Sequence, residues 1–593
     1  QAWLVDAGGC ETGPALPKPG NADIVYANCK GRFSVFDKRL GTERSHYIGA
    51  SNIYGHDPDD LRYRFQRVAP VHVSPHDADV VYMGSQYVHR TRDDGRTWET
   101  ISPDLTARRP EHQVISGEPI TRDITGEEYY STLYSLRESP VRAGVIWAGA
   151  NDGPVHLTRD GGESWHEVTP RGLPPGGRVD AVEPSPHDAA KAYVAVHRYL
   201  LADWKPYVYR TDDYGRSWAL LTDGDNGIPA DEPVRVVRED PVREGLLFAG
   251  TDAGIYVSFD DGEHWQSFQQ NLPVTLVTDL KIVRGDLAIS TMGRGFFVLD
   301  NIATLREATP SLLGDAPLLF SPEATIRYRQ IYRGGLDSAG VPDYPAPAVE
   351  IDYYLPEDAG EVRIEIVAED GWIVNAFRSA HGSRADDATE PEADMATGAV
   401  PFLRDEALSA EAGIQRFRWN MRHRGPWHED EDRRFAGGPY ATPGSYEVRL
   451  IVGDETRTRP LELLADPRVV AAGVTLADMR AQTALSLELV ELLGEARRLA
   501  HRLEAERDRL VAAERGASGT RRAAIDALLA ELVAADQIYP QPMLSEQISY
   551  LHDMLDTADQ APGGEALARF RELSTALDGL RARASDEVLS EDS

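Results

Sequence analysis

The chain has 593 residues, 41% of them hydrophobic and 8% aromatic, which is enough for roughly two to four domains with packed cores. Its 96 acidic residues outnumber the 62 basic ones, and the net charge of −34 argues against nucleic acids and anionic membranes as partners, because both attract cationic surfaces. No apolar run approaches the ~18 residues of a membrane span, so none is predicted.

The N-terminal segment holds both cysteines. Cys10 and Cys29 are too few for a structural zinc site, which usually takes four ligands, and the sequence leaves open whether they pair. The chain begins QAWLVDAGGCETG, without a starting Met or a charged-then-apolar leader. We therefore expect it to have been cut from a longer protein.

Four copies of the motif Ser/Thr-x-Asp-x-Gly-x-x-Trp punctuate the first half of the chain. Each copy predicts a hairpin turn: the Asp accepts hydrogen bonds from turn amides, the Gly adopts a positive φ, and the Trp begins the next strand. An Asp committed to its own turn is poorly placed to touch a substrate, so we interpret these boxes as structural. The boxes lie at 91–98, 158–165, 211–218 and 258–265, and their key residues are Asp93, Gly95, Trp98, Asp160, Gly162, Trp165, Asp213, Gly215, Trp218, Asp260, Gly262 and Trp265.

A longer repeat of about 45 to 65 residues surrounds the boxes, a period typical of propellers and solenoids. Each unit has an alternating strand, a turn containing Pro75, Pro140, Pro186 or Pro241, a second strand, a third strand that ends in the box, and a fourth strand after it. Four antiparallel strands in radial repetition make a β-propeller blade. With degenerate units at 22–49 and 277–301, residues 1–310 predict about six four-stranded blades. The first unit begins partway, so we expect the ring to need strands from outside this sequence.

Beyond residue 310 the pattern changes twice. Residues 311–470 alternate with period two between Gly/Pro turns, which predicts a β-sandwich with a mobile acidic insertion near 381–399. Residues 471–593 predict an α-helical domain that opens with a capping box at Thr475 and Asp478 and continues with a leucine stripe at helical spacing. The stripe is interpreted as a bundle seam, with a partner-binding surface as the alternative.

Propeller sites normally form at the channel mouth, from inner strands and inter-blade loops. Three residues before each turn Pro stands a polar side chain that faces either the channel or solvent: His72, Arg137, Glu183 and Arg238. Two long loops, 107–131 and 195–210, carry further candidates for sugar or peptide binding. The loop candidates are Asp123, Glu127, Glu128, Tyr129 and Tyr130 in the first loop, and His197, Arg198, Tyr199, Asp203 and Trp204 in the second, to which Arg64 and Arg294 are added as arginines near the mouth.

A glycosidase would need two carboxyls facing each other about 5 to 9 Å apart. The catalytic candidates are Asp123, Glu128 and Tyr130, with Asp180, Glu232 or Asp279 opposite them. A sialidase would also need three converging arginines, which Arg64, Arg198, Arg238 and Arg294 are candidates to supply. No serine-hydrolase elbow, zincin motif or P-loop is present. We expect no cofactor and no metal; the acidic loops leave Ca²⁺ open, but no EF-hand-like spacing supports it.

The boxes resemble the Asp-boxes, or BNR repeats, of sialidase- and sortilin-type propellers. Stretches such as YRFQRVAPVHVSPHD, DLAISTMGRGFFVLDN and TPGSYEVRLIV are similar to a large bacterial family often labelled "glycosyl hydrolase" or "sortilin N-terminal domain-containing". The resemblance covers nearly the whole chain. It implies a missing N-terminal part with a secretion signal and further blades, an Ig-like module, a helical end, and an extracellular or periplasmic location. Activity does not follow from it, because the hydrolase label in such families rests on the boxes.

Three hypotheses of function result. The preferred one is a secreted or periplasmic propeller that binds a peptide or glycan at its channel mouth. The alternative is a glycoside hydrolase, sialidase-like or other, that uses paired carboxylates at the same mouth. The third is a structural scaffold in an extracellular assembly. In the preferred hypothesis the sandwich and the helical domain act as docking or assembly modules, through which a protein partner is expected to bind.

Overall fold

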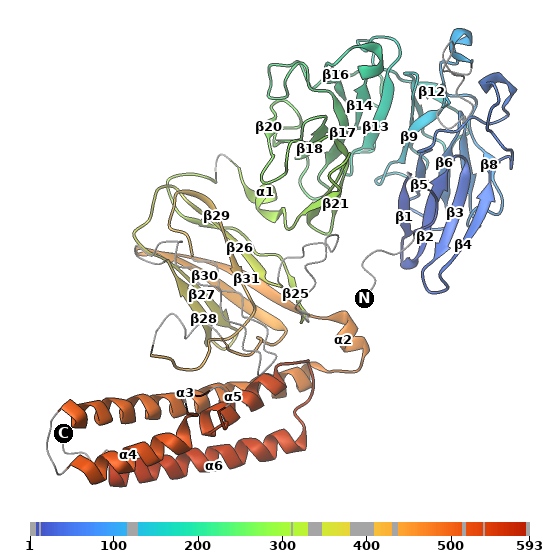
Figure 1. Cartoon of the computed structure of the whole chain (residues 1–593). Helices are drawn as coiled ribbons and strands as arrows, with labels where there is room; N and C mark the ends of the chain where they lie inside the picture. The colour runs from blue at the N-terminus through green and yellow to red at the C-terminus, as the bar shows by residue number, and fades with distance from the viewer. Residues whose placement is uncertain are drawn as a thin grey trace. The chain divides into compact units, whose positions relative to one another are not determined.

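A computed structural model describes residues 7–10, 13–114, 129–309, 312–329, 347–379, 408–429, 437–512, 518–535, 537 and 540–588. The chain divides into two compact units, Gln1–Ile302 and Ala303–Ser593 (Figure 1). The protein is mainly β, with four-stranded antiparallel sheets in the first unit and helices at the C-terminal end of the second.

The described part of the first unit contains six antiparallel sheets, five of four strands and a last one of three, in which neighbouring strands are also neighbours in sequence. This arrangement is consistent with a β-propeller. The first sheet has all four strands, so it does not begin partway as expected. The strands are β1 (Ala15–Lys18), β2 (Asn21–Cys29), β3 (Arg32–Asp37), β4 (Thr42–Tyr47); β5 (Val71–Val73), β6 (Val81–Gly84), β7 (Val88–Thr91), β8 (Glu99–Thr100); β9 (Leu133–Glu138), β10 (Ile146–Ala150), β11 (Val155–Thr158), β12 (His166–Glu167); β13 (Arg178–Pro184), β14 (Ala192–His197), β15 (Val208–Thr211), β16 (Ala219–Leu220); β17 (Val234–Glu239), β18 (Leu247–Thr251), β19 (Ile255–Ser258), β20 (Gln266–Ser267); and β21 (Val277–Val283), β22 (Asp286–Thr291), β23 (Phe296–Leu299).

Successive sheets pack on one another through their apolar residues. One core cluster joins the first and second sheets, another the second and third, and another the third and fourth. The first strands of the second to sixth sheets also contact each other in series, β5 with β9, β9 with β13, β13 with β17 and β17 with β21. We call these five the inner strands. Short 3₁₀ turns η1 (Pro58–Asp60), η2 (Pro110–His112) and η3 (Tyr199–Leu201) lie in the connections between strands.

The strand order separates two ends of each sheet. The Pro turn joins strands one and two, and the box joins strands three and four, so in an antiparallel sheet both lie at the same end. Backbone hydrogen bonds agree, since the second and fourth boxes, in the third and fifth sheets, reach the Pro turn through Gly161 N to Gly144 O and Asp261 N to Gly245 O. We call this the box end. The connections between strands two and three, and between one sheet and the next, lie at the opposite loop end.

Each box is a turn held by its own Asp. In the first box, Asp93 Oδ1 accepts hydrogen bonds from the Thr97 backbone N and the Thr91 hydroxyl, each 2.9 Å long, while the Gly95 backbone N donates to Thr91 Oγ1 at 3.0 Å. These bonds hold the pKa of Asp93 below its ordinary value, the Thr97 backbone bond contributing most. The other three boxes repeat the pattern around Asp160, Asp213 and Asp260.

Three of the four boxes also fasten their sheet to the sheet before it through the indole of the box Trp. The indole Nε1 atoms of Trp165, Trp218 and Trp265 donate to the carbonyls of Ile101, Val168 and Leu221, which directly follow the last strand of the preceding sheet. The box glycine approaches that same residue. A Cβ on Gly215, whose φ is +77°, would stand 2.6 Å from Val168 Cβ, so only glycine fits there without strain.

The first half of the second unit consists of two sheets that share one apolar core. One sheet has the order β24-β26-β29 and the other β25-β31-β30-β27-β28, in which the β25–β31 pair is parallel. The predicted alternation is seen in β26, where Val349, Ile351 and Tyr353 are buried. The expected acidic insertion lies outside the described residues. The strands are β24 (Leu318–Leu319), β25 (Thr325–Arg327), β26 (Val349–Leu355), β27 (Val362–Ala368), β28 (Ile373–Arg378), β29 (Gly413–Trp419), β30 (Gly444–Val452) and β31 (Glu455–Ala465).

The C-terminal part is helical, as the sequence predicts. Thr475 N donates to Asp478 Oδ2 and Asp478 N donates to Thr475 Oγ1, so the predicted capping box forms. The leucine stripe is buried in a core to which α3, α4, α5 and α6 all contribute. No helix in the described ranges is both long and apolar enough to cross a membrane. The helices are α1 (Ala303–Glu307), α2 (Pro467–Ala471), α3 (Leu476–Ala512), α4 (Ser518–Leu532), α5 (Leu544–Leu555) and α6 (Gly564–Glu587).

Ion pairs within this second unit join the connection between α5 and α6 to the region of the sheets. Arg327 Nη2 lies 2.6 Å from Asp559 Oδ1, and both side chains are 2% exposed. Arg329 bonds Asp559 as well and Asp556 in addition, and Arg422 pairs with Asp556 at 2.7 Å. In the first unit, a disulfide joins Cys10 to Cys29 and ties the N-terminal segment to β2.

Candidate functional site

The inner strands carry one β-bulge each at the loop end in four consecutive sheets. In β9, β13, β17 and β21 the residue without a cross-strand partner is Tyr134, Asp180, Arg235 and Thr278, respectively. A bulge re-aims a side chain, and bulges are enriched next to active sites. The repeated bulge therefore directs a set of polar side chains to one end of the inner strands.

These side chains meet in a charged group that we call the loop-end cluster, formed by Tyr134, Arg178, Asp180, His197, Tyr199, Arg235 and Asp252. Arg235 stands at its centre: its Nε donates to Asp252 Oδ1 at 2.6 Å, and its Nη1 lies 3.8 Å from Asp180 Oδ2. Arg178 Nη2 donates to Asp180 Oδ2 at 3.0 Å. The side chains of Asp180 and Arg235 are 6% and 11% exposed, so these pairs are screened little by solvent.

Aromatic rings line the same cluster. The Arg178 guanidinium lies 4.4 Å from the Tyr134 ring centre, and that of Arg235 lies 5.7 Å from the Tyr199 ring centre. The Tyr199 ring continues to Trp204, 6.3 Å away, which is 51% exposed. Exposed aromatic faces beside fixed arginines and carboxylates suit a sugar ring, which stacks on the former and hydrogen-bonds to the latter.

Two aspartates occupy equivalent positions in loops at this end. Asp152 lies three residues before β11 and Asp252 three residues before β19. Asp152 is 3% exposed; its Oδ2 accepts from the Arg108 backbone N at 3.1 Å, while its Oδ1 is buried without a partner among the described residues. Burial raises the pKa of Asp152. Burial opposes ionisation of Asp252 too, but hydrogen bonds from His197 and Arg235 prevail and lower its pKa.

A second charged group lies nearer the box end of the inner strands. The residues three positions before each turn Pro, which the sequence left facing either channel or solvent, come together here. Arg238 bonds Glu183 Oε2 at 3.3 Å and Asp279 Oδ1 at 2.6 Å, and its Nε donates to the Leu280 carbonyl. The side chain of Asp279 is 54% exposed, whereas Glu183 is 18% exposed. We call this group the inner-strand cluster; it consists of His72, Arg137, Glu183, Arg238, Asp279 and Lys281.

The two arginines expected to bind a ligand from the loops instead hold the loops together. Arg64 is 2% exposed and bonds the Ser131 carbonyl and Asp104 Oδ2. Arg198 Nε donates to Asp203 Oδ2 at 2.8 Å, and its Nη1 donates to three loop carbonyls. Each guanidinium is thus neutralised by its own carboxylate. Arg238 likewise pairs with a carboxylate of its own, Asp279, and the convergence of these arginines expected of a sialidase stays a prediction.

The remaining candidates are dispersed. Arg294 is exposed in the turn between β22 and β23. Tyr130 is half-buried, and burial, then the charge of Asp152, raise its pKa. Tyr129 is buried, and its hydroxyl donates to the Ile53 and His56 carbonyls. Asp123, Glu127 and Glu128 lie outside the described residues, so the predicted pairs with Asp180, Glu232 or Asp279 stay a prediction.

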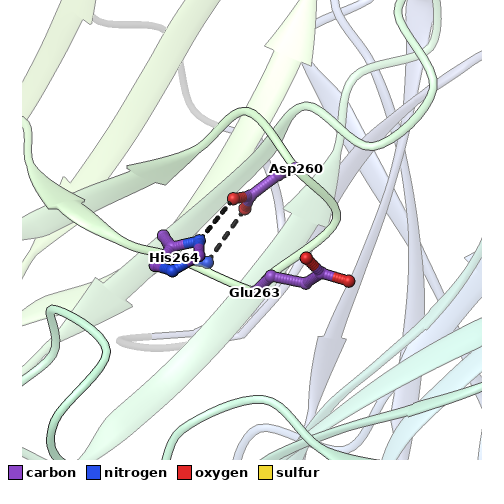
Figure 2. A group of neighbouring side chains, drawn as sticks. All are labelled: Asp260, Glu263 and His264. Carbon is purple, nitrogen blue, oxygen red and sulfur yellow. Dashed lines mark hydrogen bonds and ion pairs between the residues drawn. The ribbon is translucent and has the colours of Figure 1, made fainter.

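One box has the side chains of a cation site. Asp260, Glu263 and His264 present ligand atoms within 4.8 Å of one another, and all three are exposed (Figure 2). His264 Nδ1 lies 2.7 Å from Asp260 Oδ2, and this hydrogen bond raises the pKa of His264. Thr97, at the same place in the first box, bonds its Asp in the same way. The group is therefore explained as a variant of the box turn.

Sequence reasoning found Asp180, His197 and Tyr199 of the loop-end site but missed Arg178, Arg235, Asp152 and Asp252. The signal that identifies the two aspartates was present. Aligned on their boxes, NDGPVHLTRDGGESW and TDAGIYVSFDDGEHW place Asp152 and Asp252 at the same column. The bulges that aim Asp180 and Arg235 leave no such mark, since they depend on strand pairing.

No protein-family model matches the chain. It is similar to an oligoxyloglucan-reducing end-specific xyloglucanase of Emericella nidulans, 31% identical over 116 residues that cover 18% of this chain and 13% of that protein. Among solved structures it is similar to the GH74 xyloglucanase from Xanthomonas campestris, with 17% identity and a TM-score of 0.36 over 50% of this chain and 45% of that one. It is also similar to YCF48 from Cyanidioschyzon merolae, with 12% identity and a TM-score of 0.32 over 47% of this chain and 80% of that one.

The chain thus spans only a small part of the curated relative and less than half of the xyloglucanase structure. None of these three proteins is a sialidase or a sortilin, the propellers that the boxes resemble. The sequence similarity is to a xyloglucan-degrading enzyme, and TM-scores of this size carry no inference about activity.

Proposed function

We propose that the protein is a glycoside hydrolase that binds a glycan at the loop-end cluster and uses Asp152 and Asp252 as its acid and base. One observation carries the proposal: two carboxyls at equivalent loop positions of the third and fifth sheets have pKa values shifted in opposite directions. Glycosidases need such a pair, because one carboxyl must donate a proton to the leaving oxygen while the other is ionised.

Asp152 fits the acid. Its carboxyl is buried, its pKa is raised, and its Oδ1 has no protein partner among the described residues. Asp252 fits the ionised group, which either activates water or attacks the anomeric carbon, because Arg235 and His197 hold its negative charge. If Asp252 activates water, it takes a proton from that water and later releases it to solvent, while Asp152 regains its proton from solvent. If Asp252 attacks the anomeric carbon, Asp152 takes its proton back from the water that then displaces the sugar from Asp252.

The substrate is proposed to be a β-glucan of the xyloglucan type. The similarity to the Emericella xyloglucanase supports this class. The flat faces of Tyr199 and Trp204, which extend from the cluster to the surface, suit the equatorially substituted rings of such a glycan. The Cys10–Cys29 disulfide fits an extracellular or periplasmic location, where disulfides persist.

Reducing-end release from oligoxyloglucans, with cellulose, xylan and sialyl-lactose as comparison substrates, tests the proposal. We expect turnover of the xyloglucan substrate, and a loss of about 10²- to 10⁴-fold in kcat for Asp152→Asn and for Asp252→Asn. Asp225→Asn, in an exposed turn, serves as the matched control. Binding of the glycan with no release of reducing ends would contradict the hydrolase.

Glycan binding without turnover is the second candidate. It is favoured by the ion pairs of Asp180 and Asp252 with Arg235, which occupy carboxylates that catalysis would otherwise use. The same assay decides between the two, because a binding protein would bind the glycan and release no reducing ends. A peptide ligand, a scaffold role and a protein partner bound through the second unit stay predictions.

A further inference from the structure

The inner-strand cluster has more cations than its ion pairs use. Glu183 and Asp279 both pair with Arg238, whose Nε is taken by the Leu280 carbonyl. Arg137 and Lys281 make no hydrogen bond or ion pair through their side chains within the part of the chain that the structure describes. His72 Nε2 is buried and also has no partner there.

Unpaired positive groups close together are costly. Burial and then the charge of Arg238 lower the pKa of Arg137, and the charges of Glu183 and Asp279 oppose this shift. Burial, then the charges of Arg137 and Lys281, keep the pKa of His72 well below its ordinary value. The three residues occupy equivalent positions of β5, β9 and β21, where they pair with Tyr82, Trp147 and Ala288 of the adjacent second strands. Such an arrangement is stable when an anion occupies the space between the donors.

We propose that Arg137, Lys281 and His72 bind a carboxylate between the inner strands. The guanidinium fork of Arg137 matches the two oxygens of a carboxylate, the Lys281 ammonium supplies a second charge, and the neutral His72 imidazole donates from Nε2. Glu183 and Asp279 face the same space and repel anions. Their presence favours a singly charged carboxylate over a doubly charged phosphate.

Two classes of ligand carry such a carboxylate: free small acids and sugars with a uronic acid group. The site is separate from the loop-end aspartates, so the test of carboxylate binding does not depend on whether the protein is a hydrolase. Its position near the box end also keeps it away from the exposed ring of Trp204. A ligand that reaches it is held by charge and not by stacking.

Isothermal titration of the full chain with acetate, glucuronate and phosphate tests the site, with glucose as the uncharged comparison. We expect acetate and glucuronate to bind, phosphate to bind more weakly, and glucose not to bind. Tighter binding of glucuronate than of acetate would identify the sugar acid as the ligand; equal binding would identify a free acid. Arg137→Gln and Lys281→Gln should each weaken binding at least about tenfold, because each removes a charge-assisted hydrogen bond.

Arg142→Gln is the matched control, because Arg142 is exposed in the Pro turn after β9 and its loss removes the same charge. Lys281 is exposed, so its variant should fold even where Arg137→Gln does not, and circular dichroism verifies this. The proposal is overturned if neither carboxylate binds the wild-type chain, or if Lys281→Gln and Arg142→Gln weaken binding equally.

Discussion

The indole of Trp218 links the fourth sheet to the third through one hydrogen bond, to the Val168 carbonyl at 2.7 Å. Trp218→Phe keeps an aromatic ring near Trp147, which the indole contacts edge-on, but removes the donor. Val168 O then loses this partner. Leaving a buried hydrogen-bonding group without its partner costs about 1 to 3 kcal/mol. Because the Trp218 side chain is only half-buried, we expect the free energy of unfolding of the first unit to fall by about 1 to 2 kcal/mol.

Gly215 tests the same contact from the backbone. Its φ of +77° is strained for any side chain, and its added Cβ would stand 2.6 Å from Val168 Cβ. We expect Gly215→Ala to cost more than Trp218→Phe, about 2 to 4 kcal/mol, because the backbone strain and the clash add.

Urea unfolding followed by far-UV circular dichroism measures both effects without depending on the removed indole. Trp204→Phe is the matched control. Trp204 is 51% exposed, so its change should stay within about 0.5 kcal/mol. Trp218→Phe should also leave glycan turnover unchanged. A Trp218→Phe chain as stable as the wild type, or one that keeps its stability and loses activity, would refute the structural role of the boxes.

Three further outcomes are expected. Asp559→Ala leaves Arg327 buried without its 2.6 Å partner and should cost the second unit about 3 to 5 kcal/mol in urea unfolding; a cost under 1 would contradict the buried pair. His264 has a raised pKa in the folded chain, so the stability it adds is present below its unfolded pKa of about 6.5 and lost as the pH rises through the folded value. His264→Ala should therefore destabilise more near pH 6 than near pH 9, and equal effects would show that the hydrogen bond to the box carboxylate is absent. Cys10→Ser opens the loop to Cys29, 19 residues along the chain, and should cost about 3 kcal/mol by thermal unfolding, an effect that a reducing agent reproduces in the wild type but not in the variant.

Much of the fold was predictable because it rests on local signals. The residues of each box form a turn whose hydrogen bonds all lie within seven consecutive residues, as those of Asp93 with Thr91 and Thr97 do. The capping box at Thr475 and the leucine stripe that follows are equally local. The link from Trp218 to Val168 was not predictable, because it joins sheets 50 residues apart and depends on how they pack.

The candidate site was harder to predict, because its residue types are common in this acidic chain. Arginine is a residue type that often binds ligands, but Arg64 and Arg198 instead donate hydrogen bonds to Asp104 and Asp203. Arg235 looks unremarkable in the sequence and becomes central only because a bulge aims it between two carboxylates. Whether a charged side chain is free to bind a ligand depends on which residues it pairs with in the fold, and a single sequence does not reveal these pairs.

We propose that the chemistry lies at the loop end and that the box aspartates are structural. Comparing kcat/KM on oligoxyloglucan for Asp252→Asn and for the box variant Asp213→Ala, each with its melting temperature, tests this most directly. We expect Asp252→Asn to lose turnover by at least about 10²-fold while the folded state persists, and Asp213→Ala to melt at a lower temperature with kcat/KM unchanged. Turnover abolished in Asp213→Ala at an unchanged melting temperature, with Asp252→Asn fully active, would contradict it.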